Sequence, residues 1–376
     1  MTEPHSFAPD GRPRARALGI APDGTPGPWN AITDVAGVEV GCRTLIEGDG
    51  PLRVGAGPVR TGVTAILPRG RSGRGRPCAA GRYALNGNGE MTGTAWIDEV
   101  GQLTTPITIS NTHAVGACHT GTVRWINETD PAPEWMLPVC AETFDGYLND
   151  INGGHVAPEH VVAALNSARS GPVEEGSVGG GTGMMCYGFK GGNGTASRLV
   201  EFGSRTYTVG VFLQANFGSR RELTIRGHHI GNRLEVSNAQ ESTAPAGAGS
   251  VIVIVATDAP LDPLQCTAMS RRVPFGLART GATGSHFSGD LFLTFSTAND
   301  HPSDTVFPTG DPTDLVTTTR LPWNRMDPMY TAVAEAVEEA VLNALIVNTS
   351  MTGRDGHYAP ALPHNQLKTL LANGSR

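Results

Sequence analysis

The sequence predicts a layered α/β fold built on a large mixed or antiparallel sheet. The run from Val251 to Ala256 is apolar and β-branched and lacks a 3.6-residue period, which is typical of a buried strand. Residues 329–347 place their apolar side chains on one face of a predicted helix. Strands and helices are interspersed along the chain, and the helices are too few for a strict βαβ repeat.

Other elements follow from similar patterns. Short apolar alternations predict strands within 30–68 and at 107–110, 205–215 and 290–296. Small residues after Asn111 predict a helix through Val123. A second helix is expected from Pro158 to Ser170, because proline favours the first helical turn and Gly171 can end the helix. The first thirty residues, rich in proline and glycine, are expected to form an arm over the body.

The charge composition of the chain limits which kinds of partner we expect it to bind. The chain has 376 residues and a formal net charge of -7, so no general attraction to nucleic acid or anionic membrane is expected. Four arginines at positions 69, 71, 74 and 76 form a basic cluster in a glycine-rich loop. No aromatic residues are interleaved with them, which favours a solvated loop over a nucleic-acid site. A length prior suggests two or three domains, although single α/β domains reach this size.

The cysteines and the termini predict a cytoplasmic protein. Six cysteines are scattered without a CxxC pair, which argues against a zinc site and a disulfide scaffold. The N-terminus lacks the basic start and apolar core of a signal peptide. No stretch approaches 18 consecutive apolar residues, so no membrane-spanning helix is expected.

Most familiar catalytic motifs are absent. There is no GxSxG elbow and no HExxH zinc motif, because Pro158 interrupts the helical spacing between His155 and His160. The glycine-rich run from Gly179 to Gly183 lacks the Gly-Lys-Ser/Thr ending of a phosphate loop. We therefore expect no metal and no cofactor.

Ser250 lies where a small-residue stretch, 244–249, meets the predicted strand at Val251. A serine here is often an ordinary loop-to-strand residue. If the Gly249–Ser250 bond were cut, Ser250 would carry both a hydroxyl and a free α-amino group. Because an α-amino group titrates near pH 8, it can act as a local base at neutral pH.

Three other segments carry groups that would complement such a serine, although each by itself is more often a turn or a cap. Asn216 ends a predicted strand with an amide that can donate to an oxyanion. Ser288 and Asp290 are two residues apart and share one face if the segment is extended. Residues 142–150 place three carboxylates and two aromatic rings in a short span.

The chain resembles the L-aminopeptidase D-Ala-esterase/amidase family, which includes the β-aminopeptidases. The matching segments occur in one order from about residue 30 to residue 363. They are 142–146, Gly176–Met184, 189–197, Gln214–Gly218, Gly249–Ser250, Ser288–Asp290 and Met351–Arg354.

This resemblance implies a four-layer αββα sandwich similar to N-terminal-nucleophile hydrolases, with a different strand connectivity. It also implies that one hydrolase domain, 1–376, cleaves itself at Gly249–Ser250 into an α chain, 1–249, and a β chain, 250–376. Members assemble as homotetramers and release N-terminal residues from short peptides, amides and esters.

The resemblance also assigns catalytic roles. It implies that Ser250 is the nucleophile that forms an acyl-enzyme, activated by its own α-amino group or by Ser288, which Asp290 orients. Some relatives have glutamate at the position of Asp290, so its arm is shorter here. Asn216 matches the oxyanion-hole amide.

The substrate-binding residues are likewise carried over. Glu142 matches the carboxylate that pairs with the substrate's ammonium group. Some relatives carry tyrosine at the position of Phe144, so the role of that hydroxyl is lost here or passes to Tyr147. Trp135 is a candidate pocket wall, with core packing as the equal alternative. The preference for L-, D- or β-amino acids does not follow from the sequence.

Two alternatives belong to other functional classes. One is an acyltransferase resembling the ornithine acetyltransferases, which use threonine as the nucleophile. Ser250 and the run from Gly179 to Met184 argue against it. The other is a non-catalytic assembly protein in which the Gly249–Ser250 bond stays intact.

Overall fold

Two β-sheets form the centre of the computed structural model, which describes residues 3–128, 135–236, 249–299 and 315–374. In the smaller sheet, with the order β1-β2-β5-β6, the β5–β6 pair is parallel and the other pairs are antiparallel. In the larger sheet, with the order β4-β3-β14-β13-β10-β9, β13 and β14 are the parallel pair. The strands are β1 (Glu39–Glu47), β2 (Val59–Leu67), β3 (Cys78–Ala84), β4 (Gln102–Leu103), β5 (Ile107–Asn111), β6 (Val139–Thr143), β9 (Gly192–Phe202), β10 (Arg205–Asn216), β13 (Gly249–Thr257) and β14 (Ser288–Ser296).

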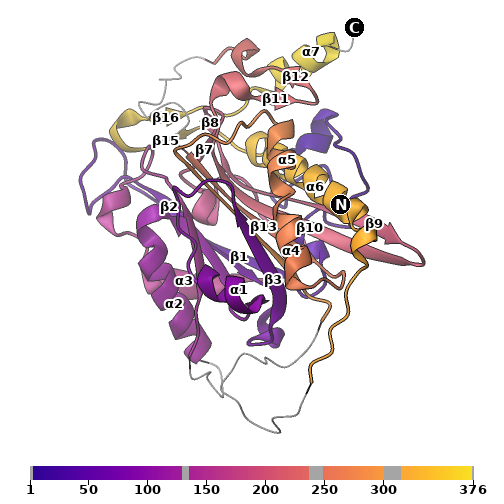
Figure 1. The fold of residues 1–376 in the computed structure, drawn as a ribbon. Coiled ribbons are helices and arrows are strands. Elements are labelled where there is room, and N and C mark those ends of the chain that lie inside the picture. The colour runs from indigo at the N-terminus through magenta and orange to yellow at the C-terminus, as the bar shows by residue number, and fades with distance from the viewer. Residues whose placement is uncertain (1–2, 129–134, 237–248, 300–314, 375–376) are drawn as a thin grey trace.

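Helices cover the outer face of each sheet, so the described chain has four layers (Figure 1). Helices α2 and α3 pack on the smaller sheet, while α4 and α6 pack on the larger sheet with α5 beside α6. The helices are α1 (Thr94–Val100), α2 (Val115–Asn127), α3 (Pro158–Ser167), α4 (Pro263–Ser270), α5 (Val273–Arg279), α6 (Asp327–Ile346) and α7 (His364–Gly374). Three two-stranded ribbons lie outside the sheets: β7 (Met185–Cys186) with β8 (Phe189–Lys190), β11 (Thr224–Ile225) with β12 (His228–His229), and β15 (Met351–Thr352) with β16 (Tyr358–Ala359).

Strand β13 is buried on both faces, as its apolar sequence predicts. Ile252 and Ile254 belong to the core between the two sheets. Val251 and Val253 belong to the core between the larger sheet and its helices. Burying each such side chain contributes roughly 1.5–3 kcal/mol, so the strand that carries Ser250 is firmly held.

The structure confirms the predicted elements at β5, α2, β10, β13, β14 and α6 within a few residues. Helix α3 ends at Ser167 because Ala168 adopts an extended conformation. Strand β9 has no counterpart among the predicted strands, because its first residues are rich in glycine and lack a strand pattern. Gly194 is required there, since a side chain would overlap the Ala340 carbonyl of α6. The predicted loop at 244–248 lies outside the described residues.

The N-terminal arm is anchored by buried ion pairs. The Arg14 guanidinium lies 2.7 Å from Glu175, and the Arg16 guanidinium lies 2.7 Å from Glu339 of α6. Arg198 of β9 binds the same Glu339 carboxylate at 2.8 Å. The arm therefore lies over the body, as predicted, and ties β9 to α6.

Candidate active site

Ser250 occupies the second position of β13, between two neighbouring strands. It pairs with Asn216 of β10 on one side and with Gly289 of β14 on the other. The residue is 3% exposed, and its Oγ has no hydrogen-bond partner among the described residues. A buried hydroxyl without a partner is costly, which marks this position as one selected for something other than stability.

Gly249 precedes Ser250 where two backbones come close together. A side chain at this position would lie 2.5 Å from the Asn216 carbonyl oxygen and 2.9 Å from the Phe217 Cα atom. Glycine therefore fits the Gly249–Ser250 junction where larger residues would clash.

The Asn216 side chain is held at both ends. Its Oδ1 accepts the Met185 N–H at 2.9 Å, and its Nδ2 donates to the Phe144 carbonyl at 2.9 Å. These two contacts fix which end of the amide is nitrogen. An amide nitrogen carries two hydrogens, so one N–H remains for another acceptor. Because Asn216 pairs directly with Ser250, the two side chains share the face turned toward the smaller sheet.

Ser288 and Asp290 form a buried dyad on β14. The Ser288 hydroxyl donates to Asp290 Oδ1 at 2.6 Å, as their spacing on an extended strand predicts. Asn86 donates to Asp290 Oδ2 at 2.9 Å. Burial raises the pKa of Asp290, although both of these hydrogen bonds oppose the shift.

The dyad flanks the Gly249–Ser250 bond from the other face of the sheet. Ser288 pairs with Gly249 and Asp290 pairs with Val251, so strand alternation turns their side chains toward the helices. The Ser250 side chain points toward the smaller sheet. In the uncut chain, the dyad therefore lies beside the peptide backbone of the junction and not on the Oγ side.

A hollow of about 240 Å³ opens over this dyad. Its walls are mostly apolar and include Leu85, Phe217 and Phe275, while Ser288 and Asp290 supply polar groups.

Glu142 lies at the end of β6, close to the Ser250 position. It is 3% exposed; its Oε1 accepts the Glu90 N–H at 3.0 Å, and its Oε2 accepts the Thr112 hydroxyl. Burial raises the pKa of Glu142 against these two hydrogen bonds. A side chain at Gly89 would lie 3.3 Å from Glu142 Oε1 and 3.1 Å from the Gly289 Cα atom. The carboxylate therefore lies near Gly289, the strand partner of Ser250.

The two aromatic residues of this segment point in different directions. Phe144 is half exposed, and its ring packs over Gly146. The Tyr147 ring stacks on His357 with 4.6 Å between the ring centroids, and burial raises its pKa. The structure thus places Phe144 at the rim of the site and directs Tyr147 toward the β15–β16 ribbon.

Trp135 lies at the surface. Its ring contacts Trp96 edge to face, with 5.5 Å between centroids, and the residue is 37% exposed. This is the contact of a surface pair, and it shares no described contact with Ser250 or Asn216.

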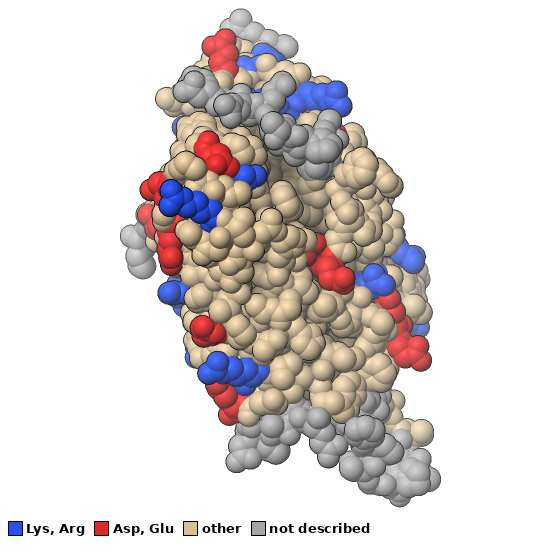
Figure 2. All heavy atoms as spheres, turned by 90° about the vertical axis from the view of Figure 1, so that its left-hand side faces the viewer, with Lys and Arg blue, Asp and Glu red and all other residues tan. Residues whose placement is uncertain are grey.

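The described residues also bear on metal sites, membrane-spanning helices and the distribution of surface charge. Within the described residues there is no group of three His, Cys, Asp or Glu side chains that could hold a metal ion, and no helix is long and apolar enough to span a membrane. On the face shown in Figure 2, acidic and basic side chains are intermingled.

The basic cluster at positions 69–76 makes more contacts with the protein than a solvated loop would. Arg69 donates to the Pro77 and Thr297 carbonyls, and Arg74 lies over the Trp125 ring.

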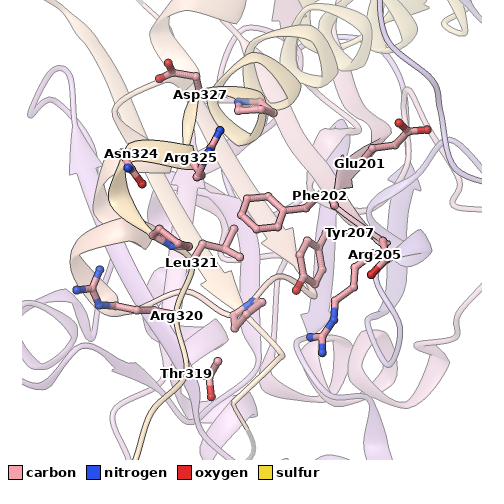
Figure 3. Close-up of a pocket in the computed structure, with 15 residues that line it drawn as sticks. Glu201, Phe202, Arg205, Tyr207, Thr319, Arg320, Leu321, Asn324, Arg325 and Asp327 are labelled. Atoms are coloured by element: carbon pink, nitrogen blue, oxygen red, sulfur yellow. The ribbon is translucent and has the colours of Figure 1, made fainter.

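A separate cavity of about 920 Å³ lies between the β9–β10 hairpin and the segment before α6 (Figure 3). Phe202 and Tyr207 line it together with Arg320 and Arg325. Tyr207 and Asn216 are nine residues apart on β10, a distance of roughly 30 Å. This cavity is therefore remote from Ser250.

Four partners in the site were not identified from the sequence. They are Asn86, Thr112 and the backbone N–H groups of Glu90 and Met185. Each comes from a segment that is distant in sequence, so spacing alone gives no signal for it.

Comparison with known proteins shows one consistent relationship. The model of peptidase family S58 matches residues 30–359. The β-peptidyl aminopeptidase BapA of Sphingosinicella microcystinivorans is 46% identical over 370 residues, which covers 96% of this chain and 92% of that protein.

Solved structures agree. The L-aminopeptidase D-Ala-esterase/amidase from Ochrobactrum anthropi is similar with a TM-score of 0.89 and 44% identity, covering 97% of this chain and 99% of that one. Its structure is described as a new variant of the Ntn hydrolase fold. A β-aminopeptidase from a Burkholderia species has a TM-score of 0.87 and 44% identity, covering 96% and 98%. These similarities confirm the predicted fold class.

Proposed function

This chain belongs to peptidase family S58, and on that premise we propose that it is a self-processing serine aminopeptidase with Ser250 as its nucleophile. The observation that carries this proposal is the position of Ser250. Its unpartnered, buried hydroxyl lies at the start of β13 directly opposite the clamped amide of Asn216.

The first reaction is cleavage of the chain's own Gly249–Ser250 bond. Ser250 Oγ attacks the Gly249 carbonyl carbon, and the hydroxyl proton passes to the Ser250 nitrogen as the C–N bond breaks. Water then hydrolyses the resulting ester, which leaves a carboxylate on Gly249 and a free amino group on Ser250. The products are an α chain, 1–249, and a β chain, 250–376, of one domain. Pairing of β10 with β13 supports their continued association.

Turnover of substrate repeats the same bond changes. The α-amino group of Ser250 takes the hydroxyl proton, because its ordinary pKa near 8 suits a base at neutral pH. It passes this proton to the leaving amine or alcohol as the acyl-enzyme forms, and water then hydrolyses the ester. The remaining Asn216 N–H stabilises the oxyanion of the acyl-transfer step. Ser288 and Asp290 flank the freed amino group from the helix-facing side of the sheet and orient it.

Glu142 accounts for aminopeptidase rather than endopeptidase activity. A nearly buried carboxylate close to Gly289 favours a substrate that brings a positive charge to it. The N-terminal ammonium of a short peptide, amide or ester meets that requirement, and Phe144 at the rim contacts the adjoining part of the substrate. Relatives named for L-, D-Ala and β-peptidyl substrates support testing all three.

The proposed nucleophile is tested by comparing two variants, Ser250→Ala and the control Ser204→Ala. Ser204 is an exposed serine at the β9–β10 turn. Each variant is assayed with the p-nitroanilides of L-Ala, D-Ala and β-Ala. Ser250→Ala should remain one full-length chain and hydrolyse none of them, whereas Ser204→Ala should be processed and active. A Ser250→Ala protein that still splits would assign cleavage to another residue.

We also infer a homotetramer of processed αβ units in the cytoplasm. The six cysteines support the location, because the structure places none of them in a disulfide. Light scattering of the purified protein tests the assembly, and cell fractionation tests the location.

A further inference from the structure

Two buried ionisable side chains near the proposed nucleophile have no role in the mechanism above. Lys190 and Asp145 are both fully buried. The Lys190 ammonium donates to the carbonyl oxygens of Met184 and Gly191 at 2.8 Å each. Asp145 Oδ1 accepts the Asn149 amide at 3.0 Å.

The negative charge of Asp145 acts on Lys190. Burial lowers the pKa of Lys190 to about 7, although the negative charge of Asp145 opposes this shift. Burial raises the pKa of Asp145 to about 7 against the hydrogen bonds from Thr61 and Asn149. Buried charged groups are seldom stabilising on balance, so a structural role alone explains their presence poorly.

Their neighbours along the chain are the residues that hold the Asn216 amide. Met184, which Lys190 binds, precedes Met185, whose N–H donates to Asn216 Oδ1. Asp145 follows Phe144, whose carbonyl accepts from Asn216 Nδ2. Lys190 and Asp145 thus hold the two segments that hydrogen-bond to opposite ends of the Asn216 side-chain amide. The glycine-rich run gives a further contact, since a side chain at Gly183 would lie 2.9 Å from Asp145 Cβ.

We propose that Lys190 and Asp145 are a positioning pair that aims the free N–H of Asn216 at the oxyanion formed on Ser250 acylation. The pair acts through the amide and does not touch the substrate. This inference rests on the proposed function, because the oxyanion arises only if Ser250 is the nucleophile. It also gives the glycine-rich run a function, which is to bring the Lys190 and Asp145 segments into contact.

The test is a double-mutant cycle between Lys190→Met and Asn216→Ala, read as kcat for a p-nitroanilide. Misplacing a catalytic group by about 1 Å can cost on the order of 100-fold. We therefore expect Lys190→Met to lower kcat roughly 10- to 100-fold when Asn216 is present, and less than about threefold in the Asn216→Ala background. KM should change little, because Glu142 stays in place.

A structural role predicts a different result. If Lys190 only supports the fold, its loss should lower kcat by the same factor in both backgrounds, and that outcome overturns the proposal. So does an Asn216→Ala variant with wild-type kcat. Ser250→Ala separates these failures from failure of the function: if it retains activity, the nucleophile is wrong; if it is inactive, an additive cycle removes the positioning pair alone.

Two measurements keep the test decisive if a variant is poorly processed or poorly folded. Cleavage of the Gly249–Ser250 bond also forms an oxyanion when Ser250 attacks, so the half-time of cleavage can replace kcat in the double-mutant cycle. Asp145→Asn replaces Lys190→Met if the latter does not fold, because asparagine can still accept the Asn149 hydrogen bond. Coupling of this variant to Asn216→Ala supports the proposal, and additivity contradicts it.

Discussion

Glu142→Gln should separate substrate recognition from folding. Glutamine has nearly the same shape as glutamate, and its carbonyl oxygen can still accept the Glu90 N–H. Its amide nitrogen can donate to the Thr112 hydroxyl, which donates to the wild-type carboxylate. The local hydrogen bonds therefore survive, and the negative charge is the property that is lost.

The size of the effect follows from the burial of the carboxylate. A hydrogen bond to a charged group contributes about 1.5–3 kcal/mol, which corresponds to roughly 10- to 150-fold in affinity. KM for substrates with a free N-terminal ammonium should rise by this factor. Substrates with an acetylated N-terminus bring no positive charge, so their KM should change much less.

Glu142→Gln should weaken substrate binding but should not lower the stability of the fold. Because the folded-state pKa of Glu142 is raised, the folded protein binds this proton more tightly than the unfolded chain does. The stability from this group is present at low pH and is lost as pH rises through the folded pKa. At neutral pH the substitution should therefore leave the melting temperature equal or higher.

Paired kinetic and thermal assays check this reasoning. KM is measured for an alanine p-nitroanilide and its N-acetylated counterpart, and melting is followed at pH 7 without substrate. An equal rise in KM for both substrates would remove Glu142 from ammonium recognition. A markedly lower melting temperature would show that the charge stabilises the fold.

Other consequences can be tested with single substitutions. Because the pKa of Lys190 is lowered to about 7, the unfolded chain binds its proton more tightly, and the contribution of Lys190 to stability should rise from about pH 7 to about pH 10. The free energy of unfolding of Lys190→Met, measured from denaturation curves, should lack this rise, although Asp145 and Cys186 still face position 190. An unchanged rise would mean that another group causes it. Glu339→Gln removes the negative charge that pairs with Arg16 and Arg198 and should lower the unfolding free energy by about 3–5 kcal/mol, whereas a loss under 1 kcal/mol would contradict the anchoring of the arm. Ser288→Ala should keep the melting temperature within a few degrees but reduce kcat at least tenfold, because the α-amino group of Ser250 would lose the hydroxyl that orients it; wild-type kcat would exclude such a role.

Much of the fold could be predicted because several of its central elements have sequence patterns that identify them locally. The apolar run after Ser250 and the apolar face of α6 each specify an element without help from the rest of the chain. Strand β9 was not predictable, because Gly194 is set by the close approach of α6 and such an approach leaves no periodic signal.

The site was predictable residue by residue, but not as an arrangement. The Ser288–Asp290 hydrogen bond follows from the two-residue period of a strand. The sequence does not tell which face of β14 turns toward the helices, so it gave no reason to place this dyad opposite the Ser250 side chain. The partners of Glu142 also depend on tertiary structure, since Thr112 comes from the end of the neighbouring strand β5.

Whether the Gly249–Ser250 bond is cut can be read from the intact mass of the purified protein under denaturing conditions. We expect two polypeptides, 1–249 and 250–376, with the second beginning at Ser250 and Val251. A single chain of 39.3 kDa that persists on ageing would contradict it.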